Sequence, residues 1–442
     1  MEILIKAAQF ILSLSILVTL HELGHFIPAK LFGCRIEKFY LFFDPYFSIF
    51  KIKKGETEYG MGWLPLGGYV KIAGMIDESM DTEQLKQEPQ PWEFRSKPAW
   101  QRLIIMLGGV TVNALLGILI YAGIAFYWGD EILPSANVTY GIAADSLAAE
   151  IGLKDGDKIL KVEGNTIESH FDIPKEMILN QARTLEIERE GKIMVLDLPR
   201  TYLAKLIKSK DQFIIPRFPF VVGDFVPGSV GQKAGLLKGD KIVGVDSVGA
   251  EYFNNVVAQL QLHKSKVATI NVLRNGAAVN VKVNVPESGK LGIAPVNVLS
   301  YFKTKKVEYS LLASIPAGYH HAGQTFSNYI RQFKILFNPE VKGYKQVGGF
   351  IMLGSAFSAN WDWQVFWGFT AFLSIVLAIM NILPIPALDG GHVMFTLYEI
   401  ITRRKPNEKF LEYAQVVGMV MLLGLMLLGN INDIMRLLGF NN

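Results

Sequence analysis

Long apolar runs mark four places where the chain could cross a lipid bilayer. A membrane-spanning helix needs about 20 largely apolar residues. Such runs extend from Ile3 to about Ala29, from Leu103 to Trp128, from about Phe366 to Leu383 and from about Ala414 to Leu428. The second run contains no charged residue, whereas the fourth needs its flanking residues to reach full length. This pattern predicts a multi-pass α-helical membrane protein with four transmembrane helices.

Basic residues predict how these helices are oriented, because Lys and Arg close to a membrane favour its cytoplasmic side. The first run also lacks a basic start and a small-residue cleavage site, so we interpret it as a retained anchor rather than a signal peptide. We therefore place the short loops in the cytoplasm of a bacterium, the chain in its inner membrane, and the long segment from about Gly129 to Trp361 in the periplasm. The basic residues are Lys30, Arg35, Lys38, Lys51, Lys53 and Lys54 after the first run, Arg95, Lys97 and Arg102 before the second, and Arg403, Arg404, Lys405 and Lys409 between the last two.

The long segment contains an ungapped internal repeat at a spacing of about 83 residues. Residues 146–159 match residues 229–242, and each copy reads as a short helix ended by glycine, a Gly-Asp turn and an alternating strand. The pattern resembles the PDZ domain, an α+β fold, in its circularly permuted bacterial form. PDZ domains bind extended chain ends by adding a strand to a sheet edge. Peptide C-termini are therefore candidate partners, and spacers or size filters without a ligand are the alternative.

Composition agrees with a membrane location and removes other classes of function. Half of the 442 residues are hydrophobic and 19% are charged, and the mean hydropathy is +0.27. The net charge of only +4 gives no indication of a nucleic-acid partner. Cys34 is the one cysteine, which excludes an intrachain disulfide and a Cys-x-x-Cys metal site.

A metal-binding pattern lies at the C-terminal end of the first apolar run. His21-Glu22-Leu-Gly-His25 is an H-E-x-x-H motif. Residues four apart share a helix face, so both imidazoles can bind one zinc ion while Glu22 lies where it can accept a proton from water. In a soluble helix a surface cluster would be an equal alternative. Three ionisable residues at the end of an apolar run favour metal binding, because charge is costly there and usually serves a function.

A second polar motif ends the third run. It reads Asn381-Ile-Leu-Pro384-Ile-Pro-Ala-Leu-Asp389-Gly-Gly-His392. Its prolines break the helix, which is tolerated at membrane depth where protein or water satisfies the freed backbone groups. A tetrahedral catalytic zinc site needs a third protein ligand, and Asp389 is a candidate. Alone, the motif would be a turn leaving the membrane with an aspartate at the interface.

Together the two motifs resemble the site-2 protease family of intramembrane zinc metalloproteases. Its signatures are H-E-x-x-H in one span and N-x-x-P-x-P-x-L-D-G in another, and every defined position is met. The resemblance implies that His21, His25 and Asp389 bind Zn²⁺ and that Glu22 is the general base and acid. It assigns His392 to a structural role and substrate binding to Asn381 and Pro384.

The first cytoplasmic loop extends the resemblance. Ser48–Lys53 and Glu56–Ile72 alternate well enough for strands, and the segment resembles the membrane-associated β-hairpin of the family, with Gly67 and Gly68 as substrate-binding residues. Such a hairpin offers an edge strand that holds an unwound peptide beside the metal. Three departures from the family pattern affect substrate placement: Phe42-Phe43-Asp44 replaces a G-x-G, and Gly108-Gly109 and Gly348-Gly349 each replace a Gly-Pro.

These observations predict eight segments along the chain. They are residues 1–30 for the first span with H-E-x-x-H, 31–100 for a cytoplasmic loop with the membrane-associated β-hairpin, 101–128 for the second span, 129–215 and 216–300 for two PDZ domains, 301–360 for amphipathic linker helices, 361–391 for the third span with its motif, and 392–442 for a cytoplasmic turn and the fourth span.

The resemblance implies a zinc metalloendopeptidase that cleaves transmembrane segments inside the bilayer. Its substrates would be single-span membrane proteins already trimmed on the outer side, such as an anti-sigma factor, and remnant signal peptides. Two other classes of protein, an adaptor and a transporter, account for fewer of these residues. A membrane-anchored PDZ adaptor leaves Glu22 and the Asn381–Asp389 motif without a role, and a metal transporter gains nothing from two peptide-binding modules.

Overall fold

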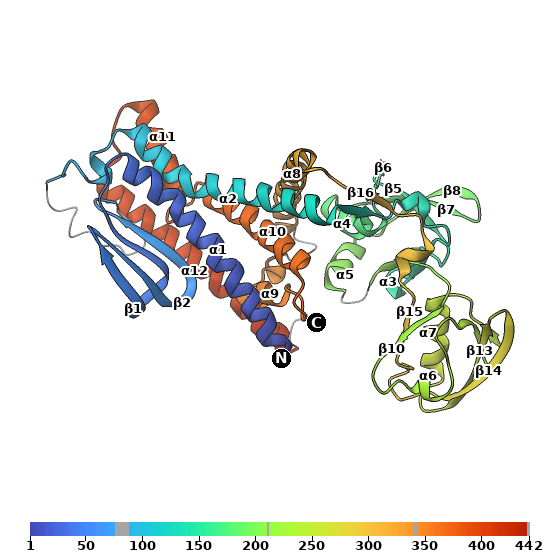
Figure 1. Ribbon diagram of the computed structural model, residues 1–442. Helices are drawn as coiled ribbons and strands as arrows, with labels where there is room; N and C mark the ends of the chain where they lie inside the picture. Colours follow the sequence, from blue (N-terminus) through green and yellow to red (C-terminus); the bar gives the residue numbers. More distant parts are fainter. Residues whose placement is uncertain (76–87, 210–211, 339–340, 342, 440–442) are drawn as a thin grey trace. The chain divides into compact units, whose positions relative to one another are not determined.

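The computed structural model describes residues 1–75, 88–209, 212–338, 341 and 343–439 (Figure 1). By its internal contacts the chain forms two compact units. A helical unit comprises Met1–Gly129, Glu308–Phe337 and Lys342–Asn442, and a second unit comprises Asp130–Val307 and Asn338–Val341.

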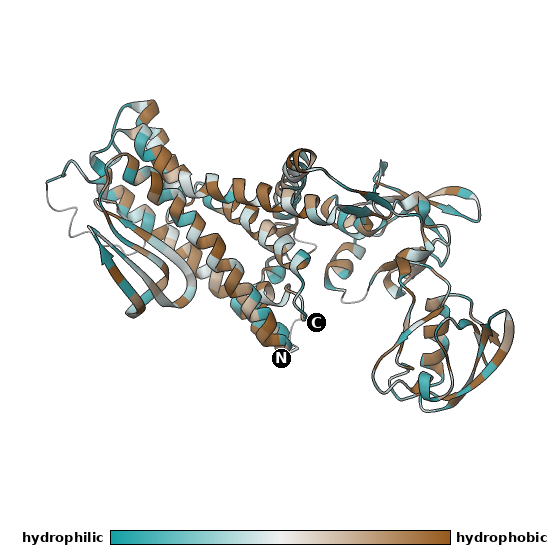
Figure 2. Ribbon diagram, viewed as in Figure 1, coloured by the Kyte–Doolittle hydropathy of each residue, from teal (hydrophilic) through white to brown (hydrophobic). Residues whose placement is uncertain are grey.

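Among the residues that the structure describes, four helices of the helical unit are long and apolar enough to cross a membrane, the number of candidate spans that the sequence predicted. At 1.5 Å per residue even the shortest, with 20 residues, reaches about 30 Å, the thickness of the hydrocarbon core. Apolar residues colour long stretches of α1 and α2 brown in Figure 2. The four helices are α1 (Glu2–Leu31), α2 (Ala99–Trp128), α10 (Trp363–Ile382) and α12 (Glu408–Leu437).

Small residues let these helices approach closely. A side-chain carbon on Gly24 of α1 would lie 2.5 Å from the Gly108 carbonyl oxygen of α2, and one on Gly117 of α2 would lie 2.6 Å from Ile375 of α10. Because association in lipid depends on close packing rather than on the hydrophobic effect, such glycines set the helix crossings. The helix α2 therefore lies against both α1 and α10.

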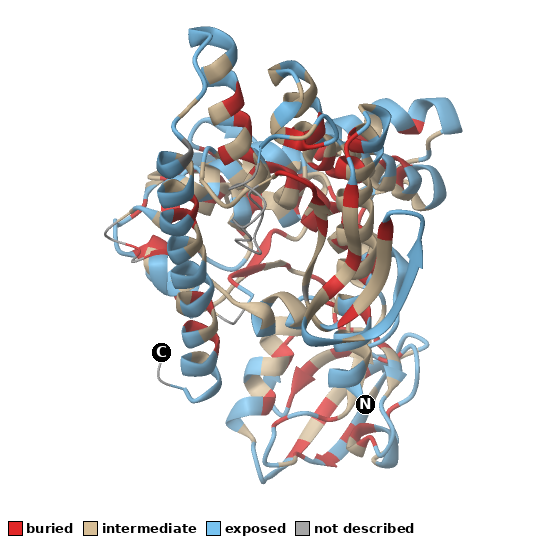
Figure 3. Cartoon of the chain, turned by 90° about the vertical axis from the view of Figure 1, so that its left-hand side faces the viewer, coloured by how far each residue is buried: buried red, intermediate tan, exposed pale blue. Residues whose placement is uncertain are grey.

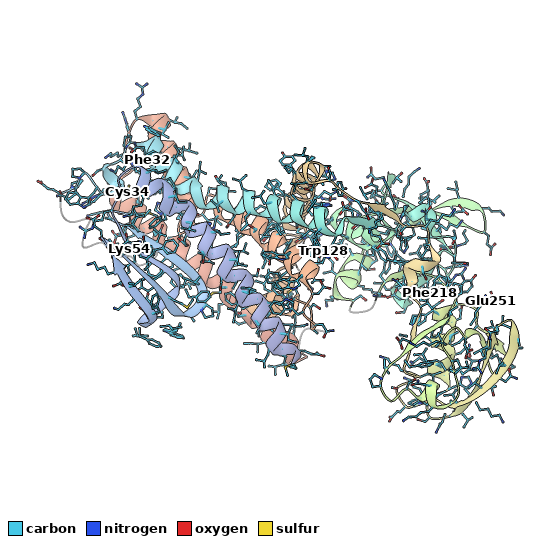
Figure 4. All side chains as sticks on the ribbon, in the orientation of Figure 1. Phe32, Cys34, Lys54, Trp128, Phe218 and Glu251 are labelled. Atoms are coloured by element: carbon cyan, nitrogen blue, oxygen red, sulfur yellow. The ribbon has the colours of Figure 1, made fainter. Side chains whose placement is uncertain are left out.

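The loop between α1 and α2 forms one antiparallel pair of long, bent strands, β1 (Ile36–Lys54) and β2 (Thr57–Ile72). Lys54, labelled in Figure 4, ends β1 just before the turn into β2. Residues 38–41 have partners on two sides, residues 58–61 and 68–71. The strand β1 starts well before the predicted Ser48. Its first half was missed because the positive φ angles of Phe42 (67°) and Tyr46 (74°) bend the chain and interrupt the alternation of side chains on which the prediction relied.

Three further helices belong to this unit. The sequence predicted a turn from residue 392 to the fourth span, whereas the structure has a 14-residue helix here, which buries Gly390, Val393 and Thr396. Its apolar positions lie on one face only, so the segment contains no continuous apolar run that would have revealed it. The three helices are α8 (Leu311–Leu336), α9 (Phe350–Ser355) and α11 (Asp389–Thr402).

The second unit contains the repeat as two similar modules. Each module has a four-stranded antiparallel sheet with its strands in the same relative order, β6-β5-β7-β8 in the first and β12-β11-β13-β14 in the second. The first module comprises β4 (Ile142–Ala144), α3 (Ser146–Glu150), β5 (Lys158–Val162), β6 (Asn165–Thr166), α4 (Ile173–Leu179), β7 (Thr184–Arg189), β8 (Lys192–Asp197), α5 (Tyr202–Lys208) and β9 (Ile214–Pro216). The second comprises β10 (Val222–Phe225), α6 (Val230–Lys233), β11 (Lys241–Val245), β12 (Val248–Gly249), α7 (Phe253–Leu262), β13 (Val267–Arg274), β14 (Ala277–Asn284) and β15 (Ile293–Pro295).

The aspartate of each Gly-Asp turn has the same partner in both modules. Arg189 donates two hydrogen bonds to Asp157, at 2.8 and 2.7 Å, and Arg274 donates two to Asp240, both at 2.8 Å. Both carboxylates are buried, at 1% exposure. The repeat in the sequence is therefore a repeat in structure, down to a bidentate ion pair.

An apolar cluster connects the two modules to the strands at the ends of the unit. Phe218, labelled in Figure 4, lies in this cluster with Leu133, Val138 and Phe302. The terminal strands are β3 (Asp130–Ile132) and β16 (Lys305–Val307), which pair with each other. The segment Asp130–Val307 of this unit thus begins and ends at one antiparallel pair.

Candidate metal centre

Two histidines meet because α1 places them one turn apart on one face. His21 Nε2 and His25 Nε2 are 3.2 Å apart, and the two rings stand edge to face. His25 is buried at 6% exposure. The i, i+4 spacing alone explains this arrangement, as the sequence predicted.

Asp389 reaches the histidines from the first residue of α11. The helix α10 ends at Ile382, because the prolines that follow cannot continue it. A short turn reverses the chain, and Asp389 Oδ2 comes to lie 3.3 Å from both His21 Nε2 and His25 Nε2. Among the residues that the structure describes, these three are the one group of His, Cys, Asp and Glu side chains able to hold a metal ion.

The three ligand atoms have the spacing that zinc requires. Zinc bonds of about 2.0–2.1 Å at tetrahedral angles separate the ligand atoms by about 3.3–3.4 Å, and the observed separations are 3.2, 3.3 and 3.3 Å. Asp389 Oδ2 is buried yet makes no well-formed hydrogen bond with any described residue, although two imidazole nitrogens are nearby. Three ligand atoms at these separations, one of them a buried carboxylate oxygen without a hydrogen-bond partner in the described part of the chain, fit a shared cation.

The outer nitrogens of both histidines have partners on α2. His25 Nδ1 lies 2.8 Å from the Ile105 carbonyl oxygen, which accepts its proton and leaves Nε2 free for metal. Asn113 Nδ2 lies 3.1 Å from His21 Nδ1, and Oδ1 of the same carboxamide is buried and has no hydrogen-bond partner among the described residues. Which end of a carboxamide is oxygen and which is nitrogen is an assignment. Turning the Asn113 amide over lets Oδ1 accept a hydrogen bond from His21 Nδ1, which gives both atoms a partner.

A glycine leaves room for the metal ligands. A side-chain carbon on Gly109 would lie 2.4 Å from His25 Nε2 and 2.5 Å from His21 Cε1. The residue therefore has to be small for α2 to lie beside the imidazoles. The sequence showed the glycine pair Gly108-Gly109, but not what it faces.

Glu22 and the ligands line a cavity of about 620 Å³. Gly68 and Val70, in β2, line the same cavity, and a side-chain carbon on Gly68 would lie 3.7 Å from Glu22 Cγ. The strand therefore passes directly beside the candidate base. Apolar side chains of Phe43, Leu64 and Met106 form other parts of the wall.

The structure brings together most of the residues that the sequence singled out. Asn381 Nδ2 lies 3.4 Å from His21 Nε2, and Gly68 lines the cavity with His392. Gly67 and Pro384 are not among its lining residues: Gly67 faces the Phe43 ring, and Pro384 lies in the turn after α10. Gln415 of α12 also lines the cavity. Sequence reasoning missed it, although a lone amide near an apolar run is a usable signal.

The chain is similar to known proteases over nearly its whole length. The family model described as "Peptidase family M50" matches residues 9–425. A Vibrio cholerae protein named as a zinc metalloprotease is 28% identical, with 99% of this chain and all of that protein covered. "Regulator of sigma E protease" of Haemophilus influenzae and "Protease RseP" of Yersinia pestis are each 27% identical, again over 99% of this chain and all of the relative.

Proposed function

The chain belongs to peptidase family M50 and is a zinc metalloprotease, and we propose that it cleaves peptide bonds inside or beside a bacterial inner membrane. The observation that supports this site of action is the position of the ligands. His21 and His25 lie on α1 and Asp389 follows α10, both helices that could span a bilayer. Substrate segments within the membrane can therefore meet the metal.

In this proposal His21, His25 and Asp389 hold the zinc ion. When bound, zinc supplies a Lewis acid that polarises the scissile carbonyl and lowers the pKa of a water toward about 7. Glu22 accepts the proton of the attacking water and delivers it to the leaving amine. The strand β2 lies beside Glu22, and Ile105 and Asn113 hold the imidazoles.

The substrate binds as an extended strand, because a helix hides the carbonyl that must be attacked. The strand β2 offers its edge to the substrate beside Glu22. Gly68 allows β2 to lie this close to α1, because a side-chain carbon on Gly68 would lie 2.7 Å from Val18 of α1. Asn381 donates a hydrogen bond from Nδ2 to a substrate carbonyl. Gly67 and Pro384 contribute indirectly, through the shape of β2 and of the turn after α10.

We further propose the substrate class and the role of the second unit. Two relatives are named for sigma E regulation or as RseP, which favours single-span proteins such as an anti-sigma factor, already trimmed on the outer side, and remnant signal peptides. The two modules are PDZ domains in the periplasm that exclude untrimmed proteins or bind peptide C-termini. The basic short loops, with the β1–β2 hairpin, face the cytoplasm.

The proposal is tested by incubating the purified full chain with a tagged single-span substrate truncated on its outer side. Wild type should cleave it, and Glu22→Gln, which keeps the shape of the side chain but cannot accept the proton, should lose at least about 100-fold in rate. Bound zinc, measured in both, should be unchanged. Equal cleavage by both proteins would contradict the role of Glu22, and wild type without zinc would contradict the metal centre.

A further inference from the structure

The turn that carries Asp389 depends on a contact outside itself. Between Leu383 and Leu388 two residues are prolines, without an N–H group. The N–H groups of Leu383, Ile385 and Leu388 bond to carbonyls of Met380, Leu383 and Ile385. That of Ala387 instead donates to Gln415 Oε1 of α12, at 3.1 Å. The turn is therefore fastened to α12 at Ala387, two residues before the metal ligand.

Ala387 has a backbone conformation that alanine does not favour. Its φ angle is +76°, in the left-handed region where the Cβ atom crowds the following carbonyl. Such conformations persist when the surroundings enforce them, and they cluster at functional sites. The hydrogen bond from Ala387 to Gln415 is one enforcing contact.

A second contact acts on the neighbouring residue. Gly418 lies one turn after Gln415, and a side-chain carbon on it would lie 1.8 Å from the Pro386 carbonyl oxygen. The backbone of α12 therefore lies directly against the turn. Gln415 and Gly418 are also the two buried residues between Lys409 and Leu428, a stretch that is otherwise exposed or half-buried (Figure 3). The burial of α12 in this stretch is thus concentrated on the turn.

We propose that Gln415 is a positioning residue of the metal centre and that Gly418 provides the space for its contact. Gln415 holds Ala387 in the left-handed conformation, and this places the Asp389 carboxylate against His21 and His25. The inference rests on the proposed zinc site. It assigns the fourth span a part in metal binding, although that span supplies no ligand.

The test measures how fast zinc leaves the purified full chain when a strong chelator is added. Partners of metal ligands typically change metal affinity 10–100-fold when removed. Gln415→Leu, which keeps the bulk but lacks an acceptor, should therefore release zinc about 10–100-fold faster than wild type, and Gly418→Ala, which pushes the turn away, should behave alike. Gly424→Ala is the matched control, because a side-chain carbon there meets nothing within 4 Å.

A rescue separates positioning from general loosening of α12. Glycine adopts a positive φ angle without strain, so Ala387→Gly should restore part of the zinc retention when added to Gln415→Leu. Wild-type release rates in Gln415→Leu and Gly418→Ala would overturn the inference while leaving the protease intact. Equally fast release in Gly424→Ala, or no rescue by Ala387→Gly, would overturn it too. Wild type without zinc would instead overturn the proposed metal centre itself.

Discussion

At the scale of single residues, the metal centre depends on side chains that never touch the metal. Asn113 is fully buried in α2, where an unpaired amide is costly. Its partner is His21, and the Ser374 hydroxyl donates to its backbone carbonyl at 2.7 Å. With the amide turned so that Oδ1 accepts from Nδ1, Asn113 selects the His21 tautomer whose unprotonated Nε2 faces the metal position.

Replacing this amide should weaken zinc binding. Asn113→Leu has nearly the same volume but cannot accept the Nδ1 proton of His21, so we expect zinc affinity to fall about 10–100-fold. Asn113→Asp keeps an acceptor and should bind zinc more tightly than Asn113→Leu. Competition with a chelating dye measures both. Thr111→Ala is the control, since Thr111 is exposed and bonds only within its own helix. Wild-type affinity in Asn113→Leu would refute the assignment.

The sequence predicted the ligands but not the residues that support them. His21, Glu22 and His25 follow from helix periodicity, and the position of Asp389 follows from the prolines and the family resemblance. Asn113 and Gln415 lie on other helices, and their contacts depend on how α2 and α12 pack. One sequence does not contain that geometry. It showed only that Asn113 is a polar residue that could face the cavity.

At the scale of elements, the ion pair of each module anchors the turn before its central strand. Asp240 accepts from Arg274 and from the Leu237 backbone N–H, at 2.8 Å in each case. The pKa of Asp240 is lowered below its ordinary value of 3.8. The main cause is the hydrogen bonding to Arg274, and the Leu237 N–H adds to it. A lowered pKa adds stability above pH 3.8, and this stability is lost as the pH falls through the folded-state pKa.

Breaking this pair should destabilise the second module. Arg274→Gln leaves the Asp240 carboxylate without its cation, so we expect the free energy of opening β11 and β13 to fall at neutral pH. Amide hydrogen exchange on these strands measures it. The variant should also lose less stability than wild type between neutral and acidic pH, because its Asp240 gains protons at a higher pH.

A surface ion pair of the same module supplies the control. Lys238 and Asp224 are 3.0 Å apart, and both side chains are more than 60% exposed. Exposed pairs contribute about 0–1 kcal/mol, so Lys238→Gln should leave the exchange rates nearly unchanged. Equal effects of the two variants would show that the buried pair has no special role.

The elements that the sequence predicted best have a simple period. The spans α1, α2 and α10 agree with the apolar runs to within a few residues, because a lipid environment requires continuous apolar helices. The first half of β1 and the helix α11 were missed. In β1 two positive φ angles interrupt the alternation of side chains. The helix α11 is apolar on one face only, and that it packs against α2 follows from the tertiary fold rather than from the local sequence.

At the scale of the whole molecule, all candidate metal ligands belong to the helical unit and the repeat belongs to the second. Selection of substrates and chemistry can therefore be separated. Replacing Asp130–Val307 with a short flexible linker should leave zinc binding intact and allow cleavage of an untrimmed single-span protein. The ratio of cleavage rates for trimmed and untrimmed substrates should fall toward one.

The same replacement in the Glu22→Gln background is the control, because cleavage there would come from another protease. Measured zinc in the shortened chain shows that the helical unit has folded. If the shortened chain still prefers the trimmed substrate as strongly as wild type, the second unit does not exclude untrimmed proteins. The helical unit would then discriminate between the two substrates.

The origin of the metal ligands at opposite ends of the chain has a consequence for biosynthesis. His21 and His25 leave the ribosome well before Asp389, which follows His25 by 364 residues in the chain. At about 5–20 residues per second, tens of seconds pass between them. During that time the nascent chain already carries the candidate base in the membrane, yet it lacks the oxygen that completes the metal site. We therefore expect no metal-dependent cleavage by the nascent chain before Asp389 has been made.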